Sequence, residues 1–214
     1  MISPRAGILF DLDGTLVDTI PLILASFDHA LTQVVGETRP EPVIRSWIGR
    51  RLGEVFEDEY PDHARELERV YIEWNLAQAA RLIRRYPGID ALVRDLNEAQ
   101  ARFGVVTSKR LTTAEDALRL SDLKGRIELL ATMESTSQHK PDPAPLLHGA
   151  ARLSTPVERC VYVGDAVVDI RAAQAAGMPS IAVTWGAGAR DDLVAAGPDH
   201  VIDDVAALHA VLLG

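Results

Sequence analysis

The stretch Gly7-Ile8-Leu9-Phe10-Asp11-Leu12-Asp13-Gly14-Thr15 decides how the rest of this chain is interpreted. A short apolar run from Gly7 to Phe10 ends abruptly at two carboxylates separated by one residue. Short apolar runs bounded by turn signals are typical of buried parallel strands, and open α/β sheets bind ligands at the carboxyl ends of such strands. The stretch therefore predicts a first strand that delivers Asp11 and Asp13 to a ligand-binding edge of a sheet.

The carboxyl-terminal part of the chain has the pattern of a parallel sheet. After Tyr86-Pro87-Gly88, short apolar runs alternate with helical stretches of similar length, as in successive βαβ units. The expected strands are 103–107, 127–131, 160–163, 180–184 and 200–202, and two of the expected helices are 144–152 and 170–176. Together with the first strand they predict an α/β fold with a Rossmann-like parallel sheet of about six strands.

The segment between these two parts has helical periodicity only. A first helix is expected with Asp18 or Thr19 as its N-cap and Pro21 in its first turn, and further helices are expected at 43–47, 52–60 and 64–83. The segment is too long to be an ordinary connection. We therefore expect an all-helical cap at 17–83, inserted into a discontinuous core formed by 1–16 and 84–214, with crossings near 16–19 and 84–88.

Composition restricts the class of partner. The formal net charge is -9, which disfavours attraction to nucleic acid or to an anionic membrane. The single cysteine, Cys160, lies in an apolar run, so we expect a buried structural thiol. No apolar stretch has the length of a membrane span, and the start of the chain lacks a secretory apolar region. We expect a cytoplasmic protein, a monomer or homodimer, that acts on a small molecule.

Polar groups follow several of the expected strands, where they would converge on one rim. Carboxylates that share such a rim repel one another at neutral pH unless a hard divalent cation holds them. Mg2+ is therefore the expected cofactor. The residues concerned are Asp11, Asp13, Thr107, Ser108, Lys140, Asp165 and Asp169.

Such a rim is suited to the hydrolysis of a phosphate ester. A carboxylate can attack phosphorus to form an acyl phosphate, and we assign this nucleophilic role to Asp11. Asp13 is free to protonate the leaving oxygen and then to deprotonate the attacking water. The Thr107 and Ser108 hydroxyls are expected to bind phosphate oxygens, and Lys140 is expected to neutralise their charge.

These residues, in this order, resemble the haloacid dehalogenase superfamily along nearly the whole chain. Asp11 to Asp18 resembles its first motif, Val106-Thr107-Ser108 its second, Lys140-Pro141-Asp142-Pro143 its third, and Gly164-Asp165 with Asp169 its fourth. The resemblance implies metal binding by Asp11, by the main-chain carbonyl of Asp13 and by Asp165, with Asp169 in support. Ala166 departs from the pattern, because relatives often carry a hydroxyl residue there.

The insert resembles the helical cap of the phosphoglycolate phosphatase-like branch. Ile48-Gly49-Arg50-Arg51-Leu52 is similar to its cap loop, and Trp185-Gly186 is similar to a segment of its core. This branch implies a phosphatase for a small phosphorylated metabolite, of which phosphoglycolate and pyrophosphate are examples. Arg45, Arg50 and Arg51 are the guanidinium groups that could clamp a second anionic group, and the alternative is that they lie on a solvated helix face.

Other functions remain open at this level. A sugar phosphomutase of the same superfamily would carry a cap histidine where this chain has Ile23. A dehalogenase needs neither a metal nor an acid at Asp13. A non-catalytic phosphate-sensing protein could keep the same residues without turnover.

Overall fold

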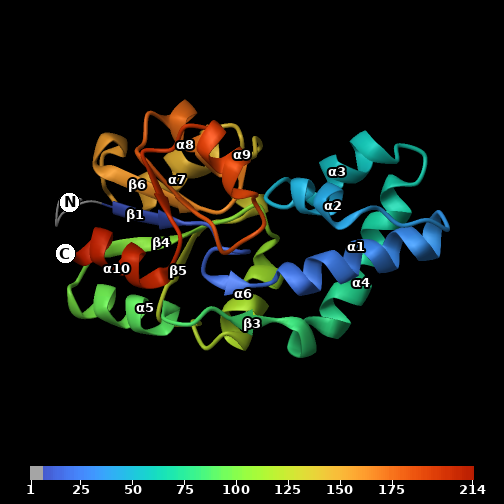
Figure 1. Cartoon of the computed structure of the whole chain (residues 1–214), viewed down its shortest axis with the longest axis horizontal. Helices are drawn as coiled ribbons and strands as arrows, with labels where there is room; N and C mark the ends of the chain where they lie inside the picture. The colour runs from blue at the N-terminus through green and yellow to red at the C-terminus, as the bar shows by residue number, and fades with distance from the viewer. Residues whose placement is uncertain (1–6) are drawn as a thin grey trace.

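The computed structural model describes residues 7–214 and divides into a sheet layered with helices and a group of helices to one side of it (Figure 1). Residues 1–6 of the predicted core lie outside the described part of the chain. The sheet contains β1 (Gly7–Phe10), β4 (Arg102–Val106), β5 (Glu128–Ala131), β6 (Cys160–Gly164), β7 (Ser180–Val183) and β8 (His200–Ile202).

The strands are all parallel and follow the order β5-β4-β1-β6-β7-β8. Phe10 at the end of β1 pairs with Val105 of β4 and with Val163 of β6, so these carboxyl ends are level with one another. The α/β fold class is confirmed, and each predicted strand agrees with the structure to within one residue at either end.

Helices cover both faces of the sheet because successive strand residues point to opposite sides. Ile8 and Phe10 contribute to one apolar cluster with α5 (Ile89–Glu98), α6 (Leu111–Leu120) and α10 (Val205–Leu213), whereas Leu9 contributes to another with α7 (Ala144–Arg152) and α8 (Val167–Ala176). α9 (Arg190–Ala195) packs on α8 and β7 through Leu193. Short 3-10 turns occur at Met133–Ser135 and Val157–Arg159.

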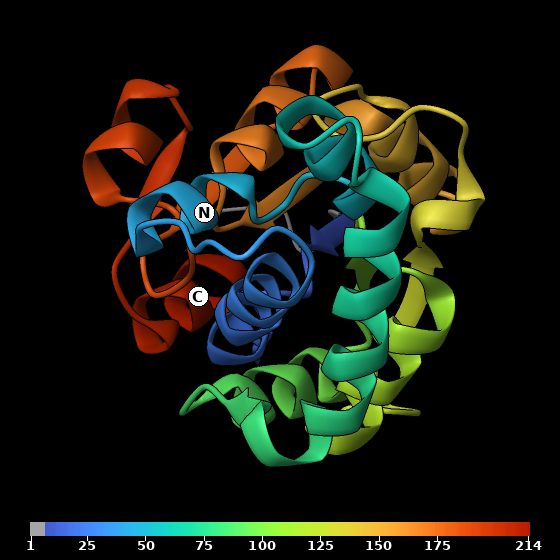
Figure 2. The same ribbon diagram turned by 90° about the vertical axis from the view of Figure 1, so that its right-hand side faces the viewer.

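The cap consists of α1 (Ile20–Val34), α2 (Glu41–Trp47), α3 (Leu52–Glu59) and α4 (Ala64–Leu82), and it lies in front of the sheet in Figure 2. It has an apolar cluster of its own. Phe27 is at the centre of this cluster, with ring centroids 5.2 Å from Trp47, 5.4 Å from Phe56 and 4.8 Å from Tyr71. The helices expected from the sequence are therefore present and enclose a separate apolar interior.

Two very short strands form the connections between core and cap. β2 (Val17–Asp18) pairs antiparallel with β3 (Arg84–Arg85), where the sequence predicted the two crossings. Thr19 is at the N-cap position of α1, but its hydroxyl donates to Asp13 Oδ1 at 2.6 Å instead of capping the helix. The exact domain limits at 16/17 and 83/84 stay a prediction.

Candidate active site

The two acids of the opening stretch lie in different surroundings. The Asp11 N–H donates to Val163 O at 2.8 Å, which extends the sheet pairing by one residue, and the Asp11 side chain is 4% exposed. Asp13 instead accepts from the Lys109 ammonium, with Nζ 3.0 and 3.2 Å from its two oxygens, and from Thr19. Asp11 and Asp13 therefore have different hydrogen-bond partners although they are only two residues apart in the sequence.

Lys140 forms hydrogen bonds with two of the acids at the sheet edge. Its ammonium lies 2.8 Å from Asp11 Oδ1, 2.6 Å from Asp169 Oδ1 and 3.0 Å from the Tyr162 hydroxyl, so its three N–H donors each have an acceptor. The Tyr162 hydroxyl in turn donates to Val106 O at 2.9 Å. The sequence predicted Lys140 at this rim but did not identify Tyr162, which lies within an apolar strand and has the pattern of a core residue.

Asp165 is held in one orientation by bonds and by close packing. Its Oδ1 accepts from the Thr15 hydroxyl at 2.8 Å, and its Oδ2 accepts from the Ala187 N–H at 2.7 Å. A Cβ atom at Gly14 or at Gly186 would lie 2.2 Å from Asp165 Oδ2. These two positions therefore require glycine because the carboxylate occupies the space of a side chain.

Three buried carboxylates gather beside Lys140. Asp11, Asp165 and Asp169 each offer an oxygen, and these oxygens all lie within 4.8 Å of one another. Burial raises the pKa of Asp11 to about 7; the Lys140 charge lowers that pKa, and the Asp169 and Asp13 charges raise it. Burial, then Asp169 and Asp11, raise the pKa of Asp165 well above its usual range. One lysine does not balance three carboxylates, so this all-oxygen set suits a hard divalent cation.

Lys140 stays charged within this cluster. Burial by itself would lower its pKa, but the carboxylates of Asp11 and Asp169 outweigh burial and raise the pKa well above its usual range. The Asp13 side chain is outside the cluster, in its ion pair with Lys109. The metal contact expected of Asp13 concerns its main-chain carbonyl and stays a prediction.

The end of β4 supplies hydroxyl groups near the acids. Thr107 is buried, and its hydroxyl oxygen accepts from the Lys109 N–H at 3.2 Å. Ser108 donates to Gly49 O in the cap at 2.8 Å. Lys109 was not predicted from the sequence, although its position directly after Thr107 and Ser108 was an available signal.

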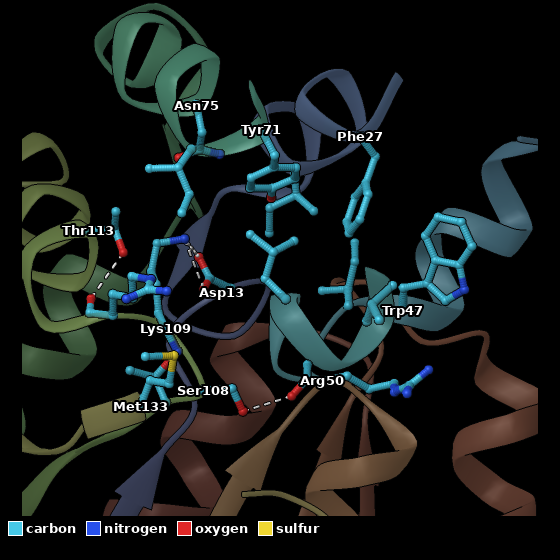
Figure 3. Close-up of a pocket in the computed structure, with 18 of the residues that line it drawn as sticks. Asp13, Phe27, Trp47, Arg50, Tyr71, Asn75, Ser108, Lys109, Thr113 and Met133 are labelled. Carbon is cyan, nitrogen blue, oxygen red and sulfur yellow. Dashed lines mark hydrogen bonds and ion pairs between the residues drawn. The ribbon is translucent and has the colours of Figure 1, made fainter. Parts of the chain in front are cut away.

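A cavity of about 100 Å³ lies between this rim and the cap, as Figure 3 shows. Asp13 and Lys109 point toward each other at its core side, whereas Phe27, Tyr71 and Asn75 approach from the cap. Its lining residues are Asp11, Asp13, Ile23, Phe27, Trp47, Ile48, Gly49, Arg50, Leu52, Val55, Glu68, Tyr71, Ile72, Asn75, Thr107, Ser108, Lys109, Arg110, Thr113 and Met133.

The cap arginines differ in their relation to the cavity. Arg50 lines it, but its guanidinium pairs with Asp58. Arg51 pairs with Glu54 at 3.0 Å and with Glu57 at 3.6 Å, and it is not one of the lining residues. Arg45 pairs with Glu41 at 2.7 Å and also donates to Gly186 O at 3.4 Å.

Ala166 lies where the cap loop meets the core. Gly49 has a positive φ of 92°, and a Cβ there would lie 2.9 Å from Val168 Cγ2 and 3.1 Å from Ala166 Cβ. The Ala166 N–H donates to Asp169 Oδ2 at 3.0 Å. Asp169 Oδ2 therefore has a hydrogen-bond donor although Ala166 lacks the hydroxyl that relatives often carry. The small Ala166 side chain also permits the close approach of Gly49.

Comparison with known proteins agrees with this architecture. The family of haloacid dehalogenase-like hydrolases matches residues 8–183. The chain belongs to this family. Its fold and the resemblance expected from its motifs are thereby confirmed, and the protein is a hydrolase of the phosphatase type that the sequence predicted.

Individual relatives match over almost their full length. Pyrophosphatase PpaX from Bacillus mycoides is 31% identical over 205 residues, with 96% of this chain and 95% of the relative covered. PpaX from Anoxybacillus flavithermus has the same identity and coverage. The crystal structure of a hydrolase from Pseudomonas syringae superposes with a TM-score of 0.87 at 25% identity, covering 97% of this chain and 98% of the other.

A predicted phosphoglycolate phosphatase from Haemophilus somnus shares the fold, with a TM-score of 0.86 at 23% identity and 99% of each chain covered. Within residues 7–214, no helix is both long enough and apolar enough to cross a membrane. The cytoplasmic location and the oligomeric state stay predictions.

Proposed function

We propose that this protein is an Mg2+-dependent phosphohydrolase that cleaves a small phosphorylated metabolite through an aspartyl-phosphate intermediate on Asp11. The observation that carries the proposal is the Asp11 carboxylate itself. It is buried at the sheet edge, it lines the cavity, and Lys140 holds one of its oxygens at 2.8 Å. Fixing one oxygen in this way leaves Oδ2 to serve as the nucleophile.

The reaction consists of two displacements at phosphorus. Asp11 Oδ2 forms a bond to phosphorus while the ester bond breaks, and Asp13 gives a proton to the leaving oxygen. Asp13 then takes a proton from a water that attacks the acyl phosphate, which releases phosphate and restores Asp11. Lys109 and Thr19 orient Asp13, which as a carboxylate is ready for the second transfer; for the first transfer it must carry a proton, and Oδ2 would release Lys109 to do so.

Charge on the transferring group is balanced by neighbouring residues. Lys140, Thr107 and Ser108 are assigned to the phosphate oxygens. To do so, Ser108 would have to release Gly49 O, and Lys140 would have to release one of its three acceptors. Asp11, Asp165 and Asp169, with the Asp13 carbonyl, would hold Mg2+, which when bound supplies further positive charge to the phosphate oxygens.

The cap, residues 17–83, is assigned to substrate selection. It supplies most of the cavity wall that faces the acids. The relatives named pyrophosphatase make pyrophosphate one candidate substrate, and the cap type makes phosphoglycolate another. We expect the segment 16–19 to act as a hinge through which closure of the cap excludes water.

The nucleophile assignment is tested with Asp11→Asn. With Mg2+ and p-nitrophenyl phosphate, we expect kcat/KM to fall by at least about a thousandfold, because an amide cannot attack phosphorus. Asp116→Asn, which alters an exposed ion pair with Arg119, is the matched control and should retain the parental rate. An Asp11→Asn enzyme as active as the parent would show that the nucleophile is another group.

A phosphomutase receives no support from the cavity, because the position where those enzymes carry a histidine is occupied by the apolar Ile23. The phosphate-sensing alternative predicts phosphate binding without turnover. Phosphate release that EDTA abolishes would exclude it.

A further inference from the structure

The cavity has two chemically different ends. At the core end it is lined by Asp11, Asp13 and Lys109. At the cap end most of the wall is apolar or aromatic and is formed by Ile23, Phe27, Val55, Tyr71 and Ile72. The polar cap residues that line the cavity are Arg50, Glu68 and Asn75. If the transferred phosphoryl group lies against Asp11, the leaving group must occupy the cap end. The chemistry of that end therefore restricts the leaving group, an argument that rests on the function proposed above.

The cap end offers no free positive charge among the described residues that line the cavity. The lining cations are Arg50, Lys109 and Arg110, and each is already paired with a carboxylate: Arg50 with Asp58, Lys109 with Asp13, and Arg110 with Glu68 at 2.7 Å. In Figure 3 the Arg50 guanidinium also points away from Asp13 and Lys109. A second carboxylate or phosphate on the substrate would gain a cation here only by displacing one of these carboxylates, and would otherwise lose its hydration without a partner.

Tyr71 adds no charge to this wall. Burial, reinforced by the Asp13 carboxylate, raises the pKa of its phenol above the usual range. Its ring packs against Phe27 and Phe56, so its aromatic surface belongs to the apolar wall. The leaving group is therefore expected to be uncharged and to present carbon atoms to this wall.

Asn75 supplies one polar contact in the apolar end. Its side chain is 5% exposed and its amide nitrogen donates to the Ser26 hydroxyl oxygen at 3.0 Å. The Ser26 hydroxyl proton is used in a bond to Leu22 O at 2.7 Å, so Ser26 can only accept from Asn75. This fixes the orientation of the amide and leaves Asn75 Oδ1 without a hydrogen-bond donor among the described residues, at the wall of the cavity.

We infer that the substrate is the phosphate monoester of a small, uncharged alcohol, whose apolar carbon body contacts Ile23, Phe27 and Ile72 and whose far end donates one hydrogen bond to Asn75 Oδ1. A hydroxyl or amide N–H would provide that donor. The small size is inferred from the cavity, whose volume is about 100 Å³. Phosphoglycolate and pyrophosphate, which place a second anion at this end, are disfavoured.

The first test is a substrate comparison with the wild-type enzyme and Mg2+. The probes are ethyl, propyl and butyl phosphate, their ω-hydroxy derivatives, phosphoglycolate and pyrophosphate, and the measured quantity is kcat/KM. We expect the best ω-hydroxyalkyl phosphate to exceed its unsubstituted counterpart by about fivefold, as one net hydrogen bond gives. It should exceed phosphoglycolate and pyrophosphate by at least about tenfold.

Two variants then test the Asn75 hydrogen bond and the apolar wall separately. Asn75→Leu should reduce the ratio between hydroxylated and plain esters to about one, a ratio that does not depend on the folded fraction. Ile72→Lys places a cation at the apolar wall and should shift the preference toward phosphoglycolate by at least about tenfold. Leu76→Lys adds the same charge on α4 at an exposed position outside the cavity, and it should leave the preference unchanged.

The outcomes distinguish this inference from the proposed function. If phosphoglycolate or pyrophosphate is the best substrate of the wild type, or if Asn75→Leu keeps the hydroxyl preference, the inferred leaving group is wrong while the phosphohydrolase stands. If none of the esters is hydrolysed and p-nitrophenyl phosphate is not hydrolysed either, the proposed function itself has failed.

Discussion

The core rim and the cap wall face each other across one cavity, and they are built in opposite ways. At the rim, Asp11, Lys140 and Asp169 are buried charged groups joined by direct hydrogen bonds. On the cap side, Phe27 and Tyr71 belong to an apolar cluster in which shape and ring packing dominate. Under the function proposed above, the rim carries out the reaction through fixed charges, whereas the cap selects substrates through contacts that other apolar or polar side chains could replace.

Loss of the lysine charge is expected to have the largest effect on stability. Lys140→Met would leave the carboxylates of Asp11 and Asp169 without their cation, and removing one partner of a buried charge pair costs about 3–5 kcal/mol. Urea unfolding at pH 8 in EDTA measures the free energy of unfolding. Lys124→Met, which breaks an exposed pair with Glu115, is the control and should cost less than about 1 kcal/mol. Equal costs for the two variants would contradict the buried network.

The second prediction concerns the dependence of stability on pH and metal. Because burial raises the pKa of Asp11 from 3.8 to about 7, the native state binds more protons than the unfolded state between these values. Without metal, the free energy of unfolding should therefore fall as the pH rises through this window. Mg2+ binds the ionised carboxylates and should raise the melting temperature more at pH 8 than at pH 5.

Thermal unfolding with MgCl2 or with EDTA at both pH values measures this effect. Asp11→Asn is the control, because it removes the titrating carboxyl and should flatten the fall in stability across the window. An equal Mg2+-induced shift at pH 5 and pH 8 would show that these carboxylates do not bind the ion.

The smallest expected effect comes from the contact between the two regions. Gly49 and Gly36 both have positive φ, so alanine at either position should cost about 1–2 kcal/mol in backbone strain. A Cβ at Gly49 would also press on Val168 and Ala166, whereas a Cβ at Gly36 would meet nothing within 4 Å. Only Gly49→Ala should therefore lower kcat/KM, by several-fold. Urea unfolding measures the free energy of unfolding of both variants, which should fall similarly. Equal kcat/KM for both variants would show that the cap loop does not need its close approach to the core.

The sequence predicted the strands of the sheet and the helices of the cap, but not the short strands that join the two regions. Strands such as Cys160–Gly164 are apolar runs bounded by turn residues, and the rim acids follow them directly. Local sequence therefore indicates both the strand and the position of Asp165. β2 and β3 were not predicted as strands, because two-residue strands have no periodicity and depend on pairing between residues distant in sequence.

The contacts that the sequence did not predict depend on which residues meet in space. Tyr162 follows the strand pattern of a core residue, and only the fold shows that its hydroxyl contacts Lys140. Apart from its position after Ser108, nothing in the sequence distinguishes Lys109 from other charged residues, and only the fold shows its ion pair with Asp13. Asn75 lies in a helix among polar residues, and the orientation of its amide depends on Ser26, which belongs to another helix. Such pairings cannot be read from local periodicity.

The β2–β3 pairing also has a consequence for the modularity of the chain. Val17 lies opposite Arg85, so the segment that enters the cap and the segment that leaves it are adjacent and hydrogen-bonded. A tight turn could join these two ends and close the core without the helices between them. We therefore expect that another helical insert could replace the cap on these two paired strands without altering the register of β1 and β4.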